Sequence, residues 1–232
     1  MLTGREQNQI HMVAENPDEL GEKCIAVGPV DYPDDIGTHV RDPKILEHDG
    51  IYYMVLGART KDDRGCVLVY TSRNLEDWSY ATRIELGEKF GFMWECPGYL
   101  ELEADCGVPA KYLSFSPQGL EGGRWDRGNV YAAGYMPVIG NITGGDGTYE
   151  LGDFRLWDAG FDFYAPQEFT AEDGRHILIG WMGMPDEPTY DNAPTVACGW
   201  QHCMTVPREL TAGAGGVVLQ QPAREIERHY AS

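Results

Sequence analysis

The sequence predicts an all-β protein that forms part of a β-propeller, and three observations support this prediction. First, 29 Gly and 14 Pro among 232 residues, with 42% apolar residues, indicate a globular core of short strands joined by many turns. Second, an Asp-Gly pair at Asp49-Gly50 separates two apolar runs, which is the strongest local signal of a β-hairpin. Third, similar hairpins recur with a weak repeat of roughly 60 residues, as expected of successive blades. Length alone also allows a barrel or two small domains.

Two short strands are expected before the first clear blade. They cover Gln7–Glu15 and Cys24–Val27 and are separated by the turn signal Asn16-Pro17-Asp18. Residues Met1–Gly4 look like the tail of a strand and not like the start of a domain. We therefore expect the partners of both strands to lie upstream of Met1.

A complete blade is predicted around the Asp49-Gly50 turn. Apolar runs flank this turn, and a charged tip at Lys61–Gly65 precedes two further runs. Four antiparallel strands in about 45 residues are what one propeller blade requires. The expected strands are Lys44–Leu46, Ile51–Ala58, Cys66–Thr71 and Trp78–Leu86. His39 and His48 are expected at the surface or in turns.

Two further sets of strands repeat this pattern with drift. The second set is Gly98–Glu103, Lys111–Phe115, Asn129–Tyr135 and Phe154–Trp157. The third set is Ala165–Phe169, His176–Met182, Gly199–Pro207 and Val217–Gln220. The Gly- and Thr-rich stretch Ile139–Tyr149 is expected to be a surface loop. Trp78, Trp125 and Trp157 are expected to pack between strands and not to hold a ligand.

An acidic residue recurs near the start of each set of strands. Asp42, Glu95 and Asp162 are separated by 95 − 42 = 53 and 162 − 95 = 67 residues. If each opens the innermost strand of a blade, the three carboxyl groups converge in the central channel. Glu95 lies between Trp94 and Cys96, whose side chains would exclude water and raise the pKa of its carboxyl, as a general acid requires. A strand-end glutamate facing solvent, a local Arg41–Asp42 ion pair and a turn-capping Asp162 are the alternatives.

The charge balance excludes several classes of partner. With 37 acidic and 18 basic residues the net charge is −19, which repels nucleic acids and anionic membranes and suits a neutral partner such as a sugar. The six cysteines form no CxxC pair and have no His-rich companion pattern, so zinc is not expected. No other metal or cofactor is expected either. The sequence has no apolar leader and no apolar run near the roughly 18 residues of a membrane span. Unpaired thiols in the cytoplasm are expected, with disulfides as the alternative.

These motifs together resemble glycoside hydrolase family 32, the invertase and sucrose-6-phosphate hydrolase group. The matching stretches, in the family's order, are Arg41-Asp42-Pro43, Trp94-Glu95-Cys96-Pro97, Ser116–Gly119, Phe161–Gln167, Ile179–Gly183 and Val206–Leu210. The resemblance implies a five-bladed β-propeller followed by a β-sandwich. It also implies hydrolysis of terminal β-fructofuranosides with retention, through a covalent fructosyl intermediate.

The resemblance implies a role for each matched residue. Glu95 matches the general acid/base. Arg41 and Asp42 match the motif whose aspartate binds fructose hydroxyls and stabilises the transition state. Asp162 and Tyr164 match positions near the acid/base and the sugar, and Trp181 matches an aromatic side chain at the pocket rim. Cys96 is expected to be a buried neighbour of Glu95 and not a nucleophile.

One family motif has no counterpart. The nucleophilic aspartate belongs to an Asn-Asp-Pro-Asn-Gly type motif, whereas the one Asp-Pro pair here is Asp42-Pro43. Residues 1–232 are therefore expected to be a partial propeller domain of about three blades plus part of another, truncated at both ends. We expect such a chain to bind fructosides weakly and not to hydrolyse them. Its exposed blade edges near Asn8–Glu15 are expected to make it self-associate.

Two other functions remain open at this stage. The chain could be a non-catalytic sugar-binding propeller piece. An Asn-Asp-Pro motif encoded in frame upstream of Met1 would argue against this function. It could also belong to a five-bladed arabinanase or xylosidase family, but Trp94-Glu95-Cys96-Pro97 favours a fructosidase. The sequence does not decide between sucrose, sucrose 6-phosphate and short fructans as substrates.

Overall fold

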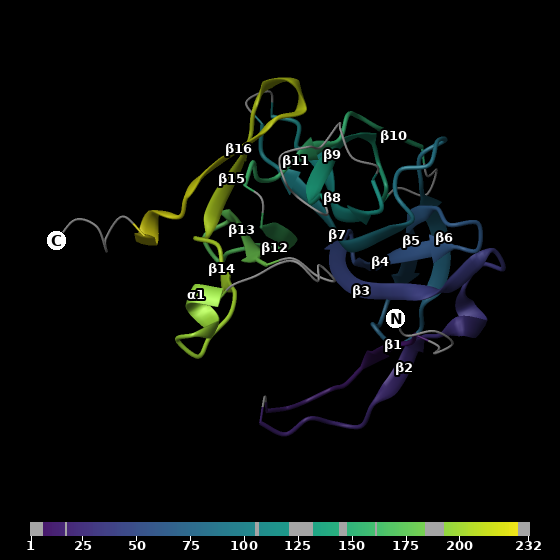
Figure 1. Cartoon of the computed structure of the whole chain (residues 1–232). Helices are drawn as coiled ribbons and strands as arrows, with labels where there is room; N and C mark the ends of the chain where they lie inside the picture. The colour runs from purple at the N-terminus through teal and green to yellow at the C-terminus, as the bar shows by residue number, and fades with distance from the viewer. Residues whose placement is uncertain are drawn as a thin grey trace. The chain divides into compact units, whose positions relative to one another are not determined.

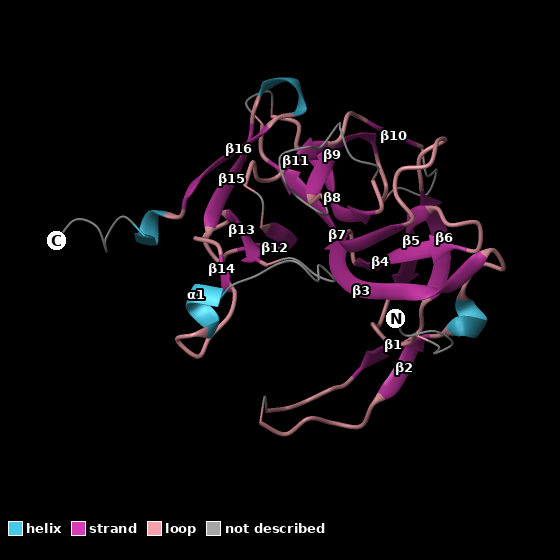
Figure 2. Ribbon diagram, viewed as in Figure 1, coloured by secondary structure: helices cyan, strands magenta, loops and turns pink. Residues whose placement is uncertain are grey.

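The computed structural model describes residues 7–16, 18–104, 107–120, 132–143, 148–160, 162–183 and 193–226. Within these residues nearly all regular structure is β-strand (Figures 1 and 2). The contacts divide the chain into two compact units. Unit 1 comprises residues 1–97, 117–119 and 143–147, and unit 2 comprises the remainder.

The main sheet of unit 1 has the strand order β3-β4-β5-β6, as predicted for one blade. Its strands are β3 (Ile36–His48), β4 (Ile51–Thr60), β5 (Gly65–Ser72) and β6 (Ser79–Ile84). The hairpin turn is confirmed, because Asp49 and Gly50 both have positive φ angles, 51° and 71°, as a type I′ turn requires. β3 begins 44 − 36 = 8 residues before the expected strand. Fully buried side chains of Val40, Leu56 and Leu68 form the core.

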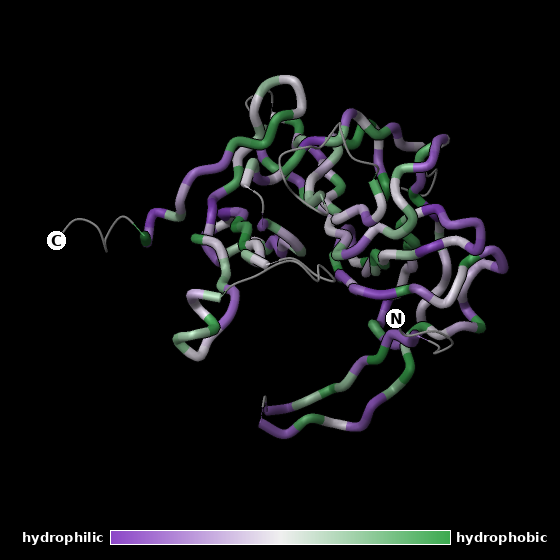
Figure 3. Tube along the Cα trace, in the orientation of Figure 1, coloured by the Kyte–Doolittle hydropathy of each residue, from purple (hydrophilic) through white to green (hydrophobic). Residues whose placement is uncertain are grey.

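The two N-terminal strands correct our expectation. β1 (Gln9–His11) pairs with β2 (Cys24–Val27) in a hairpin of its own, closed by the hydrogen bond from Glu19 N–H to the Asn16 carbonyl at 3.0 Å. A short 3₁₀ turn, Pro29–Asp31, then leads to β3. Figure 3 shows apolar residues along both arms of this hairpin, and Ile10, Val13 and Ile25 are exposed. The sequence marked the turn between these strands, but it did not show that the two strands pair with each other.

β7 (Met93–Leu102) begins in unit 1 and continues into unit 2, where it is the terminal strand of a second sheet. The order is β10-β9-β8-β7, with β11 also paired to β9. The other strands are β8 (Ala110–Gln118), β9 (Gly134–Gly140), β10 (Tyr149–Leu151) and β11 (Arg155–Leu156). The predicted loop at Ile139–Tyr149 is therefore too long, because its ends belong to β9 and β10. Residues 129–131 of the predicted third strand lie outside the described residues.

The third sheet has the order β12-β13-β15-β16, with the short β14 also paired to β13. Its elements are β12 (Phe163–Thr170), β13 (His176–Met182), α1 (Ala193–Val196), β14 (Cys203–Met204), β15 (Arg208–Ala212), a 3₁₀ turn (Ala214–Gly216) and β16 (Val218–Pro222).

The predicted strand Gly199–Pro207 is wrong in most of its length. Only Cys203 and Met204 are in a strand, and the main third strand is β15. The positive φ of His202, 64°, bends the chain before β14, and Pro207 lacks the N–H that a continuous ladder needs.

The core of unit 2 confirms the packing role predicted for one tryptophan. Trp157 is 2% exposed, its ring centroid lies 4.4 Å from that of Tyr135, and its Nε1 donates to Ser114 Oγ at 3.0 Å. Trp78 packs against the core of unit 1. Trp125 lies outside the described residues.

Candidate active site

The first strand of each large sheet contains the same local motif: a residue with a left-handed backbone conformation, followed by proline. The left-handed residues are Asp42, Cys96 and Ala165, with φ angles of 60°, 48° and 46°. In β3 and β12 the strand register also shifts at this point, which marks a β-bulge. Proline cannot donate to a ladder, so these bulges lie on strands at the end of the sheet order.

This motif shows which residue positions in the three sheets are equivalent. Arg41, Glu95 and Tyr164 each precede a left-handed residue, so these three positions are equivalent. The spacing in the sequence had indicated that Asp42 is equivalent to Glu95. The backbone angles show that it is equivalent to Cys96. Asp42 also lies inside β3, whereas Glu95 is near the start of β7 and Asp162 immediately precedes β12.

Unit 1 brings Arg41 and Glu95 together. Arg41 Nη1 lies 3.3 Å from Glu95 Oε1, and the Glu95 side chain is 14% exposed. Two effects act on this carboxyl in opposite directions: burial favours the neutral acid, and the guanidinium favours the carboxylate. A group that must both give and take a proton is served by such a balance.

Asp42 joins the same cluster through the backbone. Its Oδ2 accepts the N–H of Cys96 at 2.9 Å, and Cys96 Sγ lies 3.6 Å from the same oxygen. The carboxylate in the β3 bulge therefore accepts a hydrogen bond from the left-handed backbone of Cys96 on β7. Cys96 was expected to be buried, but it is only partly buried, and its Sγ lies beside Asp42.

Sequence reasoning missed one member of this cluster, His39. It is half-buried within β3, not in a turn, and its Nδ1 lies 2.7 Å from Arg41 Nη2. Burial, together with the Arg41 and Arg59 cations, lowers the pKa of His39 below its ordinary value. The available signal was the i, i+2 spacing to Arg41 around buried Val40, because alternate residues of a strand share a face.

Two glycines allow β7 to reach this position. A Cβ on Gly57, which pairs with Arg41, would overlap the Trp94 carbonyl, and a Cβ on Gly65 would overlap the Trp94 ring. The Trp94 side chain is fully buried, and its Nε1 donates to the Phe90 carbonyl at 2.6 Å. Trp94 thereby fixes the backbone from which Glu95 projects.

The remaining candidate residues belong to unit 2. Tyr164 is 3% exposed and pairs in register with Trp181, whose ring stacks on His202 with centroids 5.0 Å apart. Asp162 lies two residues before Tyr164 and is half-buried. Sequence reasoning did not single out His202. Convergence of all three carboxyl groups in one channel stays a prediction.

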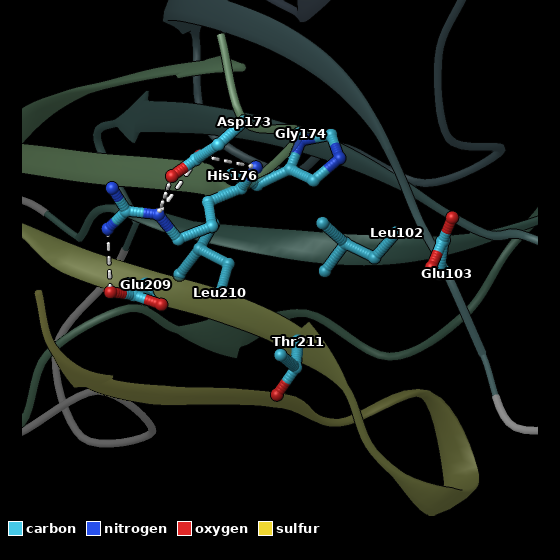
Figure 4. Close-up of a pocket in the computed structure, with 9 residues that line it drawn as sticks. Leu102, Glu103, Asp173, Gly174, His176, Glu209, Leu210 and Thr211 are labelled. Atoms are coloured by element: carbon cyan, nitrogen blue, oxygen red, sulfur yellow. Dashed lines mark hydrogen bonds and ion pairs between the residues drawn. The ribbon is translucent and has the colours of Figure 1, made fainter. Parts of the chain in front are cut away.

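A separate pocket of about 240 Å³ in unit 2 contains none of these residues. Figure 4 shows Glu103, Asp173, His176 and Glu209 around its apolar floor. In the part of the chain that the structure describes, His, Cys, Asp and Glu form no group of three that could hold a metal ion. The described helices are too short or too polar to cross a membrane.

The model of the glycosyl hydrolases family 32 N-terminal domain matches residues 2–222. The chain belongs to glycoside hydrolase family 32. The three large sheets are accordingly blades of a β-propeller, and the predicted all-β fold is confirmed.

Two relatives of this chain are named after the sugars on which they act. The sucrose-6-phosphate hydrolase of Bacillus subtilis is 39% identical over 200 residues, covering 84% of this chain and 40% of the relative. The raffinose invertase of Escherichia coli is 39% identical over 192 residues, covering 82% of this chain and 37% of the relative. The chain thus spans about 40% of the length of these relatives.

Solved structures of family members share the fold. The sucrose-6-phosphate hydrolase of Lactobacillus gasseri superposes with a TM-score of 0.75 at 31% identity, over 88% of this chain and 40% of that chain. A β-fructofuranosidase of Bombyx mori superposes with a TM-score of 0.71 at 31% identity, over 90% of this chain and 43% of that chain.

Proposed function

We propose that this protein takes part in retaining hydrolysis of terminal β-fructofuranosides, with Glu95 as the general acid/base. The observation that carries this proposal is the cluster of Arg41 and Asp42 on β3 with Glu95 on β7, in the family's motif order. The family membership and the names of its relatives support the substrate class.

Each residue then has a chemical role. In the first step Glu95 gives a proton to the departing sugar oxygen, and in the second it takes a proton from the attacking water. The Asp42 side chain accepts hydrogen bonds from fructose hydroxyls and stabilises positive charge that develops on the ring. Arg41, Asp162, Tyr164 and Trp181 are assigned to sugar binding, as the family resemblance implies. The nucleophile, about 5–5.5 Å from the acid/base carboxyl in retaining enzymes, has no assigned residue in this chain.

The proposal extends to the setting of the reaction. Residues 1–232 act as part of the catalytic propeller domain, in the cytoplasm, on sucrose, sucrose 6-phosphate or short fructans. Of these substrates, the neutral sugars suit the net charge of −19 best. The proton-transfer chemistry requires no metal or other cofactor.

Hydrolysis is tested by measuring release of glucose from sucrose and of glucose 6-phosphate from sucrose 6-phosphate. The 232-residue chain is assayed first, and we expect no turnover. A chimera is assayed next, in which residues 2–222 replace the matching segment of the Bacillus subtilis relative, and we expect turnover. In the chimera, Glu95→Gln should lower kcat by about 10²–10⁴-fold and leave fructoside binding intact. Glu103→Gln, at an exposed position outside the cluster, is the matched control.

The outcomes separate the alternatives. A folded chimera that binds fructosides without cleaving them would favour a non-catalytic sugar-binding role. Preferential cleavage of arabinosides or xylosides would favour the other five-bladed families. Unchanged turnover in Glu95→Gln would show that another group delivers the proton.

A further inference from the structure

His39 occupies a strand position from which its ring reaches a charged residue of the candidate site. Buried Val40 separates it from Arg41, so the His39 and Arg41 side chains lie on the same face of β3. Their closest atoms, His39 Nδ1 and Arg41 Nη2, are 2.7 Å apart, which is hydrogen-bond distance.

The chemistry of the two groups decides the direction of this hydrogen bond. A guanidinium has only donors, so His39 Nδ1 must be the acceptor. The ring is then neutral, with its proton on Nε2. Arg41 on β3 and Arg59 on β4 both oppose a positive charge on the ring, and Arg59 itself pairs with Asp63 at 2.6 Å.

The guanidinium of Arg41 is held through its two terminal nitrogens. Nη2 donates to His39, and Nη1 lies 3.3 Å from Glu95 Oε1. The third nitrogen, Nε, is buried and has no hydrogen-bond partner within the described part of the chain. Because the guanidinium is planar and rigid, fixing Nη2 also fixes the direction of Nη1.

We propose that His39 is a positioning residue: its neutral imidazole accepts a hydrogen bond from Arg41 and thereby aims the guanidinium at Glu95, which under the proposed function is the acid/base. A correctly placed Arg41 favours the carboxylate of Glu95, the form that must accept a proton from water in the second step. Protonation of His39 removes the acceptor, and Arg41 then loses this support. The pair therefore connects the charge of His39 to the protonation of Glu95 through Arg41.

The first test is the tautomer of His39 in the unmutated 232-residue chain labelled with ¹⁵N. We expect imidazole resonances of a neutral ring at pH 7, with the proton on Nε2 and none on Nδ1. His39→Leu identifies the signals by their disappearance. A ring protonated at pH 7, or a neutral ring with its proton on Nδ1, would overturn the proposal.

The second test follows the Glu95 side-chain carboxyl by ¹³C NMR across pH. In His39→Leu, which keeps an apolar side chain but removes the acceptor, the midpoint of the Glu95 titration should move to higher pH. His39→Asn retains an acceptor near the Nδ1 position and cannot be protonated, so it should restore the unmutated midpoint. His48→Leu, on the same strand outside the cluster, is the matched control and should change nothing.

The variants also separate positioning from simple support of the fold. Equal displacement of the Glu95 titration in His39→Leu and His39→Asn, or displacement in neither, would refute the role of the acceptor. If a variant fails to fold, the tautomer measured in the unmutated chain still decides the proposal. Normal turnover in Glu95→Gln would refute the proposed function, yet it would leave the His39–Arg41–Glu95 arrangement to be judged by these spectra alone.

Discussion

Asp42 and Cys96 both adopt left-handed backbone conformations in strands where extended backbone is the rule. Such a conformation costs a residue with a side chain roughly 1–2 kcal/mol. The hydrogen bond from Cys96 N–H to Asp42 Oδ2, at 2.9 Å, offsets part of this cost. At the scale of single residues, the side chain that is proposed to bind sugar therefore also stabilises the backbone next to Glu95, the proposed acid/base.

This double role predicts different effects for two substitutions of Asp42. Asp42→Ala removes the acceptor and should lower the free energy of unfolding by about 1–3 kcal/mol, because Cys96 N–H loses its partner. Asp42→Asn keeps an acceptor oxygen and tolerates positive φ, so its stability should remain close to that of the unmutated chain. Denaturant titrations of both variants measure the difference. Equal losses would show that the hydrogen bond contributes nothing.

At the scale of elements, β4 and β7 approach each other closely because Gly57 carries no side chain. We expect Gly57→Ala to destabilise the chain by about 1–3 kcal/mol, since the added methyl group would push the Trp94 carbonyl away. In the active chimera the same variant should also lower kcat, because Trp94 precedes Glu95. The matched control is Gly87→Ala, where a Cβ meets no atom within 4 Å. Equal melting temperatures for Gly57→Ala and Gly87→Ala would contradict this account.

Elements of the third sheet are joined by an ion-pair network around Arg175. Its guanidinium contacts Asp173 at the β12–β13 turn at 2.8 Å, Glu209 on β15 at 2.7 Å and Glu225 after β16 at 2.6 Å. The hydrogen bond from Arg175 lowers the pKa of Glu225 to about 2 and also lowers the pKa of Asp173. The pKa of Glu209 is lowered mainly by a hydrogen bond from the backbone N–H of Arg224, and to a smaller extent by the Arg175 side chain.

These directions predict how the network responds to pH. Folding lowers the pKa of the Glu225 carboxyl, so this carboxyl stabilises the folded state at pH values above 4.5, its pKa in the unfolded chain. This contribution is lost as the pH falls toward about 2, the pKa in the folded chain. Arg175→Gln should therefore reduce amide-exchange protection of β15 and β16 at pH 7, with a difference that shrinks toward pH 2 and in high salt. Arg73→Gln, at an exposed arginine of unit 1, is the control. A difference that persists at pH 2 would argue against charge as its cause.

At the scale of the whole molecule, exposed apolar side chains compete with a net charge of −19. The β1–β2 hairpin exposes Ile10, Val13 and Ile25, and two-stranded sheets are marginal without a covering layer. Self-association through this hairpin stays a prediction, and charge repulsion should oppose it at low salt.

Light scattering at low and high salt tests this prediction. We expect the 232-residue chain to form oligomers, and more of them as salt screens its charge. Ile10→Lys with Val13→Lys should reduce the oligomers, whereas Val108→Lys, at an exposed apolar position of unit 2, should not. A monodisperse monomer that melts cooperatively at every salt concentration would contradict the prediction.

Much of the fold could be predicted from local patterns. The Asp49-Gly50 turn encodes its own geometry, and the apolar runs on either side of it have the period of strands, so the four strands of the first blade were predicted, although β3 begins earlier than expected. The pairing of β1 with β2 was missed because a turn signal alone does not say which strands pair. The break before Pro207 was missed because it depends on the positive φ of His202, which the apolar pattern does not show.

By itself, the sequence determined the fold class, the family and the identity of Arg41, Asp42 and Glu95 as candidates, because these follow from short motifs and strand periodicity. Only the tertiary structure decided which atoms meet: Asp42 accepts a hydrogen bond from a residue 54 positions away, and His39 turns its ring toward Arg41. Equivalent blade positions were likewise assigned by backbone φ angles and not by spacing. The physical reason is that a hydrogen bond needs a distance and an angle set by bulges, missing Cβ atoms and packing across strands, none of which is written in the order of the residues.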